Sequence, residues 1–179
     1  AARARQDTLT KPQGSLGRLE ELSLQLAGVM ATPLPQVRHK VIVTMAGDHG
    51  VVAEGVSAYP QAVTAQMVYN FLRGGACINV LGRHVGARVV VVDMGVAVAL
   101  GPHPGLVDKK VACGTGNMAR GPAMTREQAI EAVTAGAEVV EAELARGLDI
   151  LGLGDMGIGN TTPSAAIAAA LTGCPPAEV

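Results

Sequence analysis

The sequence predicts an α/β fold: a Rossmann-like, mostly parallel sheet flanked by helices, with a small helical N-terminal part. Helical and strand patterns alternate along most of the chain, which is typical of parallel strands joined by crossover helices. The unbroken β-branched run from Val89 to Val92 indicates a strand buried on both faces, as parallel strands are. We expect the helical segment to cover residues 1–36. We expect the α/β domain to cover residues 37–179 and to be incomplete at its C-terminal end.

The first half of the chain predicts three helices and one strand. Leucines at helical spacing, and the prolines that follow them, indicate a helix from about Ser15 to Met30. Residues Val41 to Ala46 predict a buried strand that runs into a glycine-bounded turn, and a loop over residues 51–59 follows. Pro60 suits the start of a helix over "QAVTAQMVYNFL", and "ACINVLGRHV" predicts a second short helix after a pair of glycines.

The second half predicts the rest of the sheet and the longest helix. "RVVVVDMGV" predicts a strand, and "LVDKKVACGTGN" predicts a further strand or a hairpin arm that ends in a glycine turn. Thr125 and Gln128 have the spacing of a capping box, so a helix begins behind them. Its apolar residues recur on one face: Ile130, Val133, Ala137, Val140 and Leu144. A last strand over residues 149–153 and a helix behind it complete the alternation.

The composition excludes several classes of protein. The 14 basic and 15 acidic residues nearly balance and only 2% of residues are aromatic, so the chain lacks the cationic surface and stacking rings of nucleic-acid binding. The longest apolar run, Ala165–Leu171, is far shorter than the roughly 20 residues that span a bilayer, and we see no signal-peptide pattern. Three scattered cysteines predict reduced thiols rather than a zinc site. We therefore expect a cytoplasmic protein that binds no nucleic acid, membrane or metal.

Polar and glycine residues gather directly after the predicted strands. They form four turns: Asp48–His49, Asp93–Gly95, Gly114–Asn117 and Asp155–Thr162. In open parallel sheets the carboxyl ends of the strands meet at one edge, and ligands bind in the crevice outside it. We therefore expect these four turns to line one site.

The segment "GLGDMGIGNTTPSAA", residues 152–166, fits two phosphate-binding spacings and satisfies neither. Gly152, Gly154 and Gly157 have the spacing of a dinucleotide fingerprint, but no acidic residue follows at the end of a second strand. Residues 154–161 have the spacing of a Walker loop, but Asn160 stands in place of its lysine. A neutral glycine cradle before a helix suits a phosphomonoester. The alternative is a tight turn that needs glycine only for its backbone.

The sequence allows two interpretations for each of two carboxylates that follow the other strands. Asp48, beside His49, predicts ligand contact without a metal, or else a turn in which the Asp48 carboxylate accepts hydrogen bonds from backbone. Asp93 is well placed to bind a ribose hydroxyl or to hold a residue that contacts the ligand. It is equally well placed to cap its own turn.

Taken together, the motifs resemble one family along nearly the whole chain. They are "TKPQGSLGRLEELSLQLAGV", "MAGDHGVVAEGVSAYPQAVTAQMVYNFLRGGACINVL", "VVDMGV", "GTGNMARGPAMT" and "LGLGDMGIGNTTPSAA". The sequence is similar in all of them to the nicotinate-nucleotide–dimethylbenzimidazole phosphoribosyltransferases of cobalamin lower-ligand synthesis. The resemblance implies transfer of phosphoribose from nicotinate mononucleotide to 5,6-dimethylbenzimidazole, which gives α-ribazole 5′-phosphate and nicotinate. It implies no cofactor and no metal, because the cationic nicotinate ring leaves without a general acid.

The resemblance also assigns residues to the site. Asp155 becomes a candidate for a supporting carboxylate, at a place where relatives often carry glutamate. The family's principal base is a glutamate near the C-terminus, in a region that these 179 residues do not include. The candidate substrate-binding residues are Ser57, Tyr59, Gln66, Met156, Gly157, Ile158, Gly159, Asn160, Thr161, Thr162, Asp48 and Asp93. Of these, the segment from residue 157 to 162 corresponds to the phosphate and ribose end of the nucleotide.

The remaining expectations concern the second substrate and the partners. Residues 57–66 match the family's benzimidazole-pocket region, and Met156 and Met67 would contact the ring because the chain has few aromatic residues. The resemblance implies two small-molecule substrates and a homodimer, formed through the helices of residues 60–85. The alternative function is a nucleotide-binding domain without catalytic activity, which keeps the phosphate cradle and lacks the base. A dehydrogenase that uses NAD, or a P-loop NTPase, disagrees with the details of the glycine loop.

Overall fold

The computed structural model describes all of residues 1–179, which divide into two compact units, Ala1–Arg38 and His39–Val179. The first unit contains helix α1 (Ala2–Asp7) and helix α2 (Arg18–Val29). Within it, the ammonium group of Lys11 lies 2.8 Å from the carboxylate of Glu20, so the linker between the two helices is tied to α2. None of the helices combines the length and the apolar character that crossing a membrane requires.

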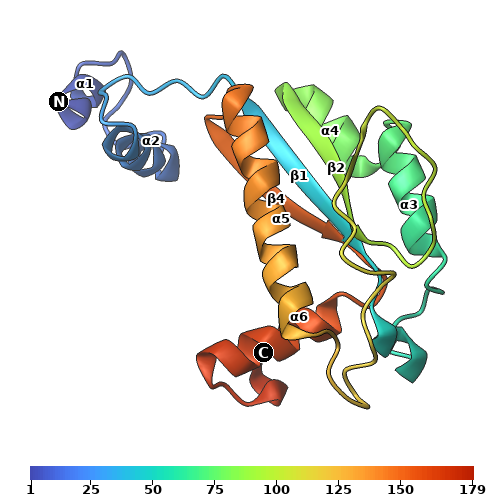
Figure 1. The fold of residues 1–179 in the computed structure, drawn as a ribbon. Coiled ribbons are helices and arrows are strands. Elements are labelled where there is room, and N and C mark those ends of the chain that lie inside the picture. The colour runs from blue at the N-terminus through green and yellow to red at the C-terminus, as the bar shows by residue number, and fades with distance from the viewer. The chain divides into compact units, whose positions relative to one another are not determined.

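The second unit is a four-stranded, all-parallel sheet flanked by helices, which confirms the predicted fold class (Figure 1). The strands lie in the order β3-β2-β1-β4. They are β1 (Lys40–Gly47), β2 (Ala87–Gly95), β3 (Leu106–Asp108) and β4 (Ile150–Met156). The helices are α3 (Val63–Leu72), α4 (Cys77–Val85), α5 (Arg126–Ala145) and α6 (Thr161–Thr172), with short 3₁₀ helices η1 (Gly50–Glu54) and η2 (Pro176–Glu178).

The two faces of the sheet are covered by different helices, because successive side chains of a strand point to opposite faces. Val41 and Val43 of β1 pack with Val139 of α5. Ala46 of the same strand packs on the other side, in a cluster with Val68 and Phe71 of α3. The core therefore consists of two apolar layers, one between the sheet and α5 and one between the sheet and α3.

The segment after β2 contains a shorter strand than its sequence predicts. β3 has only three residues and pairs with β2 in parallel, so the hairpin alternative for "LVDKKVACGTGN" is wrong. Beyond Asp108 the chain continues as irregular backbone, which stays tied to β2 through hydrogen bonds from the amides of Lys109 and Val111 to β2 carbonyls. This irregular course carries the glycine turn at residues 114–117 to the carboxyl edge of the sheet.

Helix α5 forms where the capping box predicts, and the reciprocal hydrogen bonds between Thr125 and Gln128 are present. Its predicted apolar stripe, however, is not the face that packs on the sheet: Val133 is 76% exposed. The buried face carries Ala135, Val139 and Glu143 instead. Glu143 is tolerated on this face because Arg88 and Arg146 pair with it.

Lys110 neutralises a buried carboxylate, and we expect its loss to destabilise the fold. Its ammonium group lies 3.1 Å from the buried Asp93 carboxylate and donates to the carbonyl oxygens of Val96 and Val98 at 2.6 and 2.8 Å. Lys110→Met should lower the free energy of unfolding by about 2–3 kcal/mol, since a buried charge loses its partner. Denaturant unfolding measures this. The double variant Asp93→Asn/Lys110→Met should recover part of the loss, and equal stability of Lys110→Met and the parent would contradict the assignment.

Candidate functional site

The turns that follow the strands meet at the carboxyl edge of the sheet. The amide of Asp48, after β1, donates to the carbonyl of Gly95, at the end of β2, at 2.9 Å. The amide of Thr115 donates to the carbonyl of Asp48 at 3.0 Å, and the Thr115 hydroxyl accepts from the amide of Gly50 at 3.2 Å. Backbone from three separate segments is therefore joined at this edge.

The glycine loop after β4 lies against the same edge. A Cβ atom on the buried Gly157 would lie 2.2 Å from the carbonyl oxygen of Gly47 and 2.8 Å from the His49 imidazole, so only glycine fits without a shift of backbone. The amide of Ile158 donates to the hydroxyl of Thr64, in the first turn of α3, at 3.1 Å. The loop is thus held between the end of β1 and the start of α3.

Helix α6 begins directly behind this loop, at Thr161. Gly159 has a φ of +78°, a conformation that favours glycine, and its neighbour Val52 leaves no room for a side chain. The N-terminus of a helix carries a partial positive charge and free amide groups, so a phosphate is favoured at this place. The loop supplies no cationic side chain of its own between residues 152 and 162.

Asp155 and Asn160 lie together at the mouth of the loop. The side-chain amide of Asn160 donates to the Asp155 carboxylate, which is otherwise exposed. His49 is half-buried, and neither ring nitrogen has a hydrogen-bond partner within the chain. Burial lowers the pKa of His49 below 6.5, and the charges of Asp48 and Asp155 offset part of that shift. The imidazole is therefore neutral near pH 7 and remains open to a ligand.

The lowered pKa of His49 predicts a pH dependence of stability. As the pH falls through 6.5, the unfolded chain binds a proton at this residue before the folded chain does. The free energy of unfolding should therefore decrease as the pH falls through 6.5 toward the folded-state pKa, and the slope that His49 contributes should fade gradually as the pH rises above 6.5. His49→Gln should remove this part of the slope in urea titrations at a series of pH values. Identical slopes in the variant and the parent would contradict the prediction.

The two candidate carboxylates on the α3 side are buried and engaged with backbone. Asp93 accepts from the amides of Gly95 and Val96 at 3.1 and 2.9 Å through one oxygen and pairs with Lys110 through the other, so it caps its own turn. Asp48 accepts from the amide of Ala97 at 2.8 Å, and its second oxygen is buried without a partner. Neither carboxylate opens toward the glycine loop in this arrangement.

The candidate benzimidazole residues lie on the α3 side of the site. The hydroxyl of Ser57 accepts from the amide of Tyr59 at 3.2 Å, and the Tyr59 side chain is 65% exposed. Gln66 lies on α3 and is exposed, while Met67 and Met156 pack against the apolar cluster beneath that helix. The residue that joins this segment to the glycine loop is Thr64, which was not predicted from the sequence; its only signal was its place two residues before Gln66.

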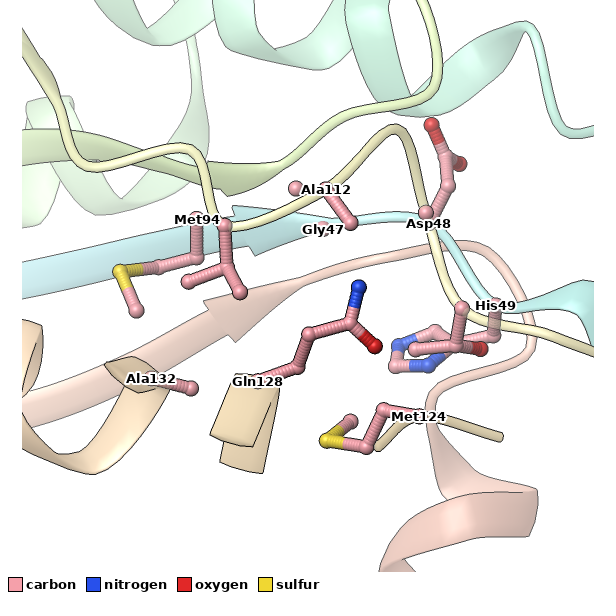
Figure 2. Close-up of a pocket in the computed structure, with 12 residues that line it drawn as sticks. Gly47, Asp48, His49, Met94, Ala112, Met124, Gln128 and Ala132 are labelled. Carbon is pink, nitrogen blue, oxygen red and sulfur yellow. The ribbon is translucent and has the colours of Figure 1, made fainter. Parts of the chain in front are cut away.

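A small cavity on the α5 side of the edge was not predicted from the sequence either (Figure 2). Its volume is about 170 Å³. Gln128 extends into it from the first turn of α5, and the imidazole of His49 lies beside it. The other lining residues are Gly47, Asp48, Met94, Gly95, Val111, Ala112, Gly114, Thr115, Met124 and Ala132. Neither here nor elsewhere in the chain does a group of three His, Cys, Asp or Glu side chains lie so that it could hold a metal ion.

A family model, curated relatives and a solved structure that resemble this chain are all described as phosphoribosyltransferases. The model of the DBI_PRT family, described as "Phosphoribosyltransferase", matches residues 1–179. Nicotinate-nucleotide–dimethylbenzimidazole phosphoribosyltransferases of Roseiflexus sp. (strain RS-1) and Desulforudis audaxviator are each 58% identical over 100% of this chain and 51% of their own length. The crystal structure of the enzyme of that name from Thermus thermophilus matches with a TM-score of 0.93 and 53% identity, over 97% of this chain and 53% of that one. The chain thus spans about half the length of the relatives that it matches.

Proposed function

The chain belongs to the DBI_PRT family of phosphoribosyltransferases, and from this premise we propose that the full-length protein transfers phosphoribose from nicotinate mononucleotide to 5,6-dimethylbenzimidazole. The products are α-ribazole 5′-phosphate and nicotinate. The relatives named above carry this activity in their names, which supports the proposal over a nucleotide-binding domain without catalysis.

One observation of the structure carries the proposal. The glycine loop and the candidate benzimidazole segment, 94 residues apart in sequence, are joined by the hydrogen bond from the Ile158 amide to Thr64. This contact holds the glycine loop at the N-terminus of α6 next to the start of α3, which carries Gln66, and so supports a phosphate site beside the candidate benzimidazole segment. A nucleotide whose phosphate lies on the loop would therefore have its sugar within reach of a ring on the α3 side.

The reaction forms one bond and breaks one. A nitrogen of the benzimidazole attacks C1′ of the ribose, and the bond from C1′ to the nicotinate nitrogen breaks. Its electron pair neutralises the positive ring nitrogen, so the leaving ring needs no proton. The proton of the attacking benzimidazole must pass to a base. The family places that base, a glutamate, outside these residues.

In this scheme the residues of this chain bind the two substrates and stabilise the positive charge that develops on the ribose. The residues from Gly157 to Thr162 hold the 5′-phosphate through backbone amides and hydroxyl groups. Asp155 faces the ribose and stabilises the positive charge that develops on it in the oxocarbenium-like transition state. The amide of Asn160 keeps the Asp155 carboxylate in place. Ser57, Tyr59 and Gln66 border the benzimidazole.

We extend the proposal to the assembly and location of the protein. Helix α4 exposes Val80, Leu81 and Val85, each more than half accessible, on the segment that the family resemblance assigns to a homodimer. Exposed apolar side chains gathered on one helix support a subunit interface at this place. The protein would work as a dimer in the cytoplasm, with small-molecule substrates and neither nucleic acid nor membrane as a partner.

The test is an assay of the full-length protein with both substrates. Chromatography should detect free nicotinate only when nicotinate mononucleotide and dimethylbenzimidazole are both present. A chelator should leave the rate unchanged, since no step involves a metal. Binding of nicotinate mononucleotide without any release of nicotinate would overturn the proposal in favour of the non-catalytic alternative.

A further inference from the structure

Thr64, in the first turn of α3, is a fully buried residue whose hydroxyl serves a distant segment of the chain. Its exposed fraction is 0%. A threonine at the start of a helix often caps that helix through its side chain, but the N-cap residue of α3 is Ala62, and no side chain caps this helix. The Thr64 hydroxyl instead accepts from the amide of Ile158, at 3.1 Å. The hydroxyl therefore belongs to the contact between α3 and the glycine loop.

Packing alone does not explain a threonine at this position. Val68, one turn later on the same face of α3, is also fully buried and belongs to the apolar cluster beneath the helix. Valine has nearly the shape of threonine and would bury more apolar surface there. It would, however, leave the half-buried Ile158 amide without an acceptor, and an unpaired amide away from water is costly. The hydroxyl of Thr64 is thus matched to this one amide.

The backbone on both sides of Ile158 is closely packed. A Cβ atom on Gly157 would lie 2.2 Å from the carbonyl oxygen of Gly47, and one on Gly159 would lie 2.8 Å from a methyl group of η1. These contacts hold the loop against β1 and η1. The hydrogen bond from Thr64 holds the same loop to α3, and a hydrogen bond has a narrow range of length and direction. It therefore sets the separation between the loop and α3.

The amides that are open to a phosphate lie next to the residue that Thr64 holds. The amides of Ile158, Asn160 and Thr162 all donate to acceptors within the chain. Those of Gly159 and Thr161 have no acceptor in it. Both of these residues lie within three positions of Ile158, so a shift of its backbone would also shift a phosphate bound to them.

Helix α3 carries the other end of the contact. Gln66 follows Thr64 by two residues, within one turn of the helix, and its side chain is exposed while that of Thr64 is buried. The two residues move together as parts of one helix. The hydrogen bond to Ile158 therefore also determines how far a ring beside Gln66 lies from a phosphate on the loop.

We propose that Thr64 is a positioning residue for phosphoribosyl transfer, whose hydroxyl fixes the separation between the phosphate on the loop and the benzimidazole on the α3 side. The inference rests on the proposed function, because it concerns the distance between the two substrates of that reaction. Attack requires the reacting atoms to lie about 3–3.5 Å apart. A change in separation would reduce turnover while each substrate keeps its own contacts. Because Thr64 is fully buried, it acts through the backbone of Ile158 and not by touching a substrate.

Substitutions in the full-length protein test this inference by steady-state kinetics. Thr64→Val keeps the shape of the side chain and removes the acceptor, and should lower kcat about tenfold with less than about a twofold change in the KM of either substrate. Thr64→Ala removes the same hydroxyl and should give a similar loss, so the test does not depend on the folding of one variant. Thr64→Ser retains the hydroxyl and should keep most of the activity.

The matched control is Thr44→Val, at a buried threonine of β1 outside the contact between α3 and the loop. Its kcat should equal that of the parent. Circular dichroism at the assay temperature shows that each variant compared is fully folded. An unchanged kcat in Thr64→Val, or a Thr64→Ser variant as slow as Thr64→Val, would overturn the inference and leave the proposed function intact.

A ligand that spans both sites distinguishes positioning from a purely structural role and requires no turnover. α-Ribazole 5′-phosphate carries the phosphate and the benzimidazole on one ribose, so its affinity depends on the separation between the two sites. Calorimetry should show about tenfold weaker binding of this ligand to Thr64→Val. The affinities for nicotinate mononucleotide alone and for dimethylbenzimidazole alone should stay unchanged.

The binding results separate the inference from the proposed function. An equal loss of affinity for all three ligands would mean that the hydroxyl only supports the fold, and would overturn the inference. If the parent releases no nicotinate yet binds α-ribazole 5′-phosphate, and Thr64→Val weakens that binding alone, the inference stands while the proposed function fails. A parent protein that does not bind α-ribazole 5′-phosphate would overturn both.

Discussion

Replacing Gly157 by alanine should reduce kcat/KM for nicotinate mononucleotide roughly 100-fold, because a displacement of about 1 Å in a positioning segment can cost this much. The new Cβ atom would lie 2.2 Å from the carbonyl oxygen of Gly47, far inside van der Waals contact, and backbone cannot move aside as a flexible side chain can. The loop must therefore shift away from β1. The same overpacking should lower the free energy of unfolding by about 1–3 kcal/mol.

The matched control is Gly154→Ala, in the strand just before the loop. There the nearest atom to the new Cβ atom would be the hydroxyl oxygen of Thr44 at 3.4 Å, an ordinary contact. Steady-state kinetics and denaturant unfolding of both variants distinguish a specific role of Gly157 from a general cost of adding a methyl group to β4. Equal kinetics in Gly157→Ala and Gly154→Ala would mean that the loop does not position the nucleotide.

Asp155→Asn should lower kcat roughly 100-fold, with little change in the affinity for nicotinate mononucleotide, since removal of one preorganised electrostatic group costs about this much in other enzymes. The substitution keeps the size of the side chain and an oxygen that can accept from the Asn160 amide. It removes only the charge that, in the proposed function, stabilises the positive charge that develops on the ribose. A rise in KM with kcat unchanged would show that Asp155 contributes to binding alone.

Asp155→Glu is the variant that separates the charge from the fold of the loop. The family resemblance implies that glutamate is accepted at this place in the motif, so Asp155→Glu should keep most of the activity that Asp155→Asn loses. Thermal unfolding of both variants should match the parent closely, because the carboxylate is exposed. If glutamate and asparagine prove equally damaging, the role of Asp155 depends on its length and not on its charge.

The parts of the fold that were predictable from sequence are those that local patterns determine. The β-branched run at Val89–Val92 indicated a central parallel strand, and β2 lies between β1 and β3. Thr125 and Gln128 located the start of α5 because a capping box involves only neighbouring residues. The gathering of polar turns at the carboxyl edge followed from the direction of parallel strands alone.

The parts that were not predictable depend on partners far away in the sequence. Glu143 lies on the buried face of α5, where it pairs with Arg88, 55 residues earlier, as well as with Arg146, so a count of apolar residues selected the wrong face. Thr64 gained its role from Ile158, and the cavity arises where Met94 and Gln128 happen to meet. No periodicity or motif encodes such contacts, which explains why the cavity had no signal in the sequence.

The central claim is that the full-length protein exchanges one ring for another on the same phosphoribose, and a single-turnover experiment tests it most directly. With enzyme in excess over nicotinate mononucleotide, nicotinate and the α-riboside should appear at equal rates and in equal amounts, and neither should appear without dimethylbenzimidazole. Release of nicotinate at the same rate with and without dimethylbenzimidazole, or formation of a β-riboside, would contradict the account.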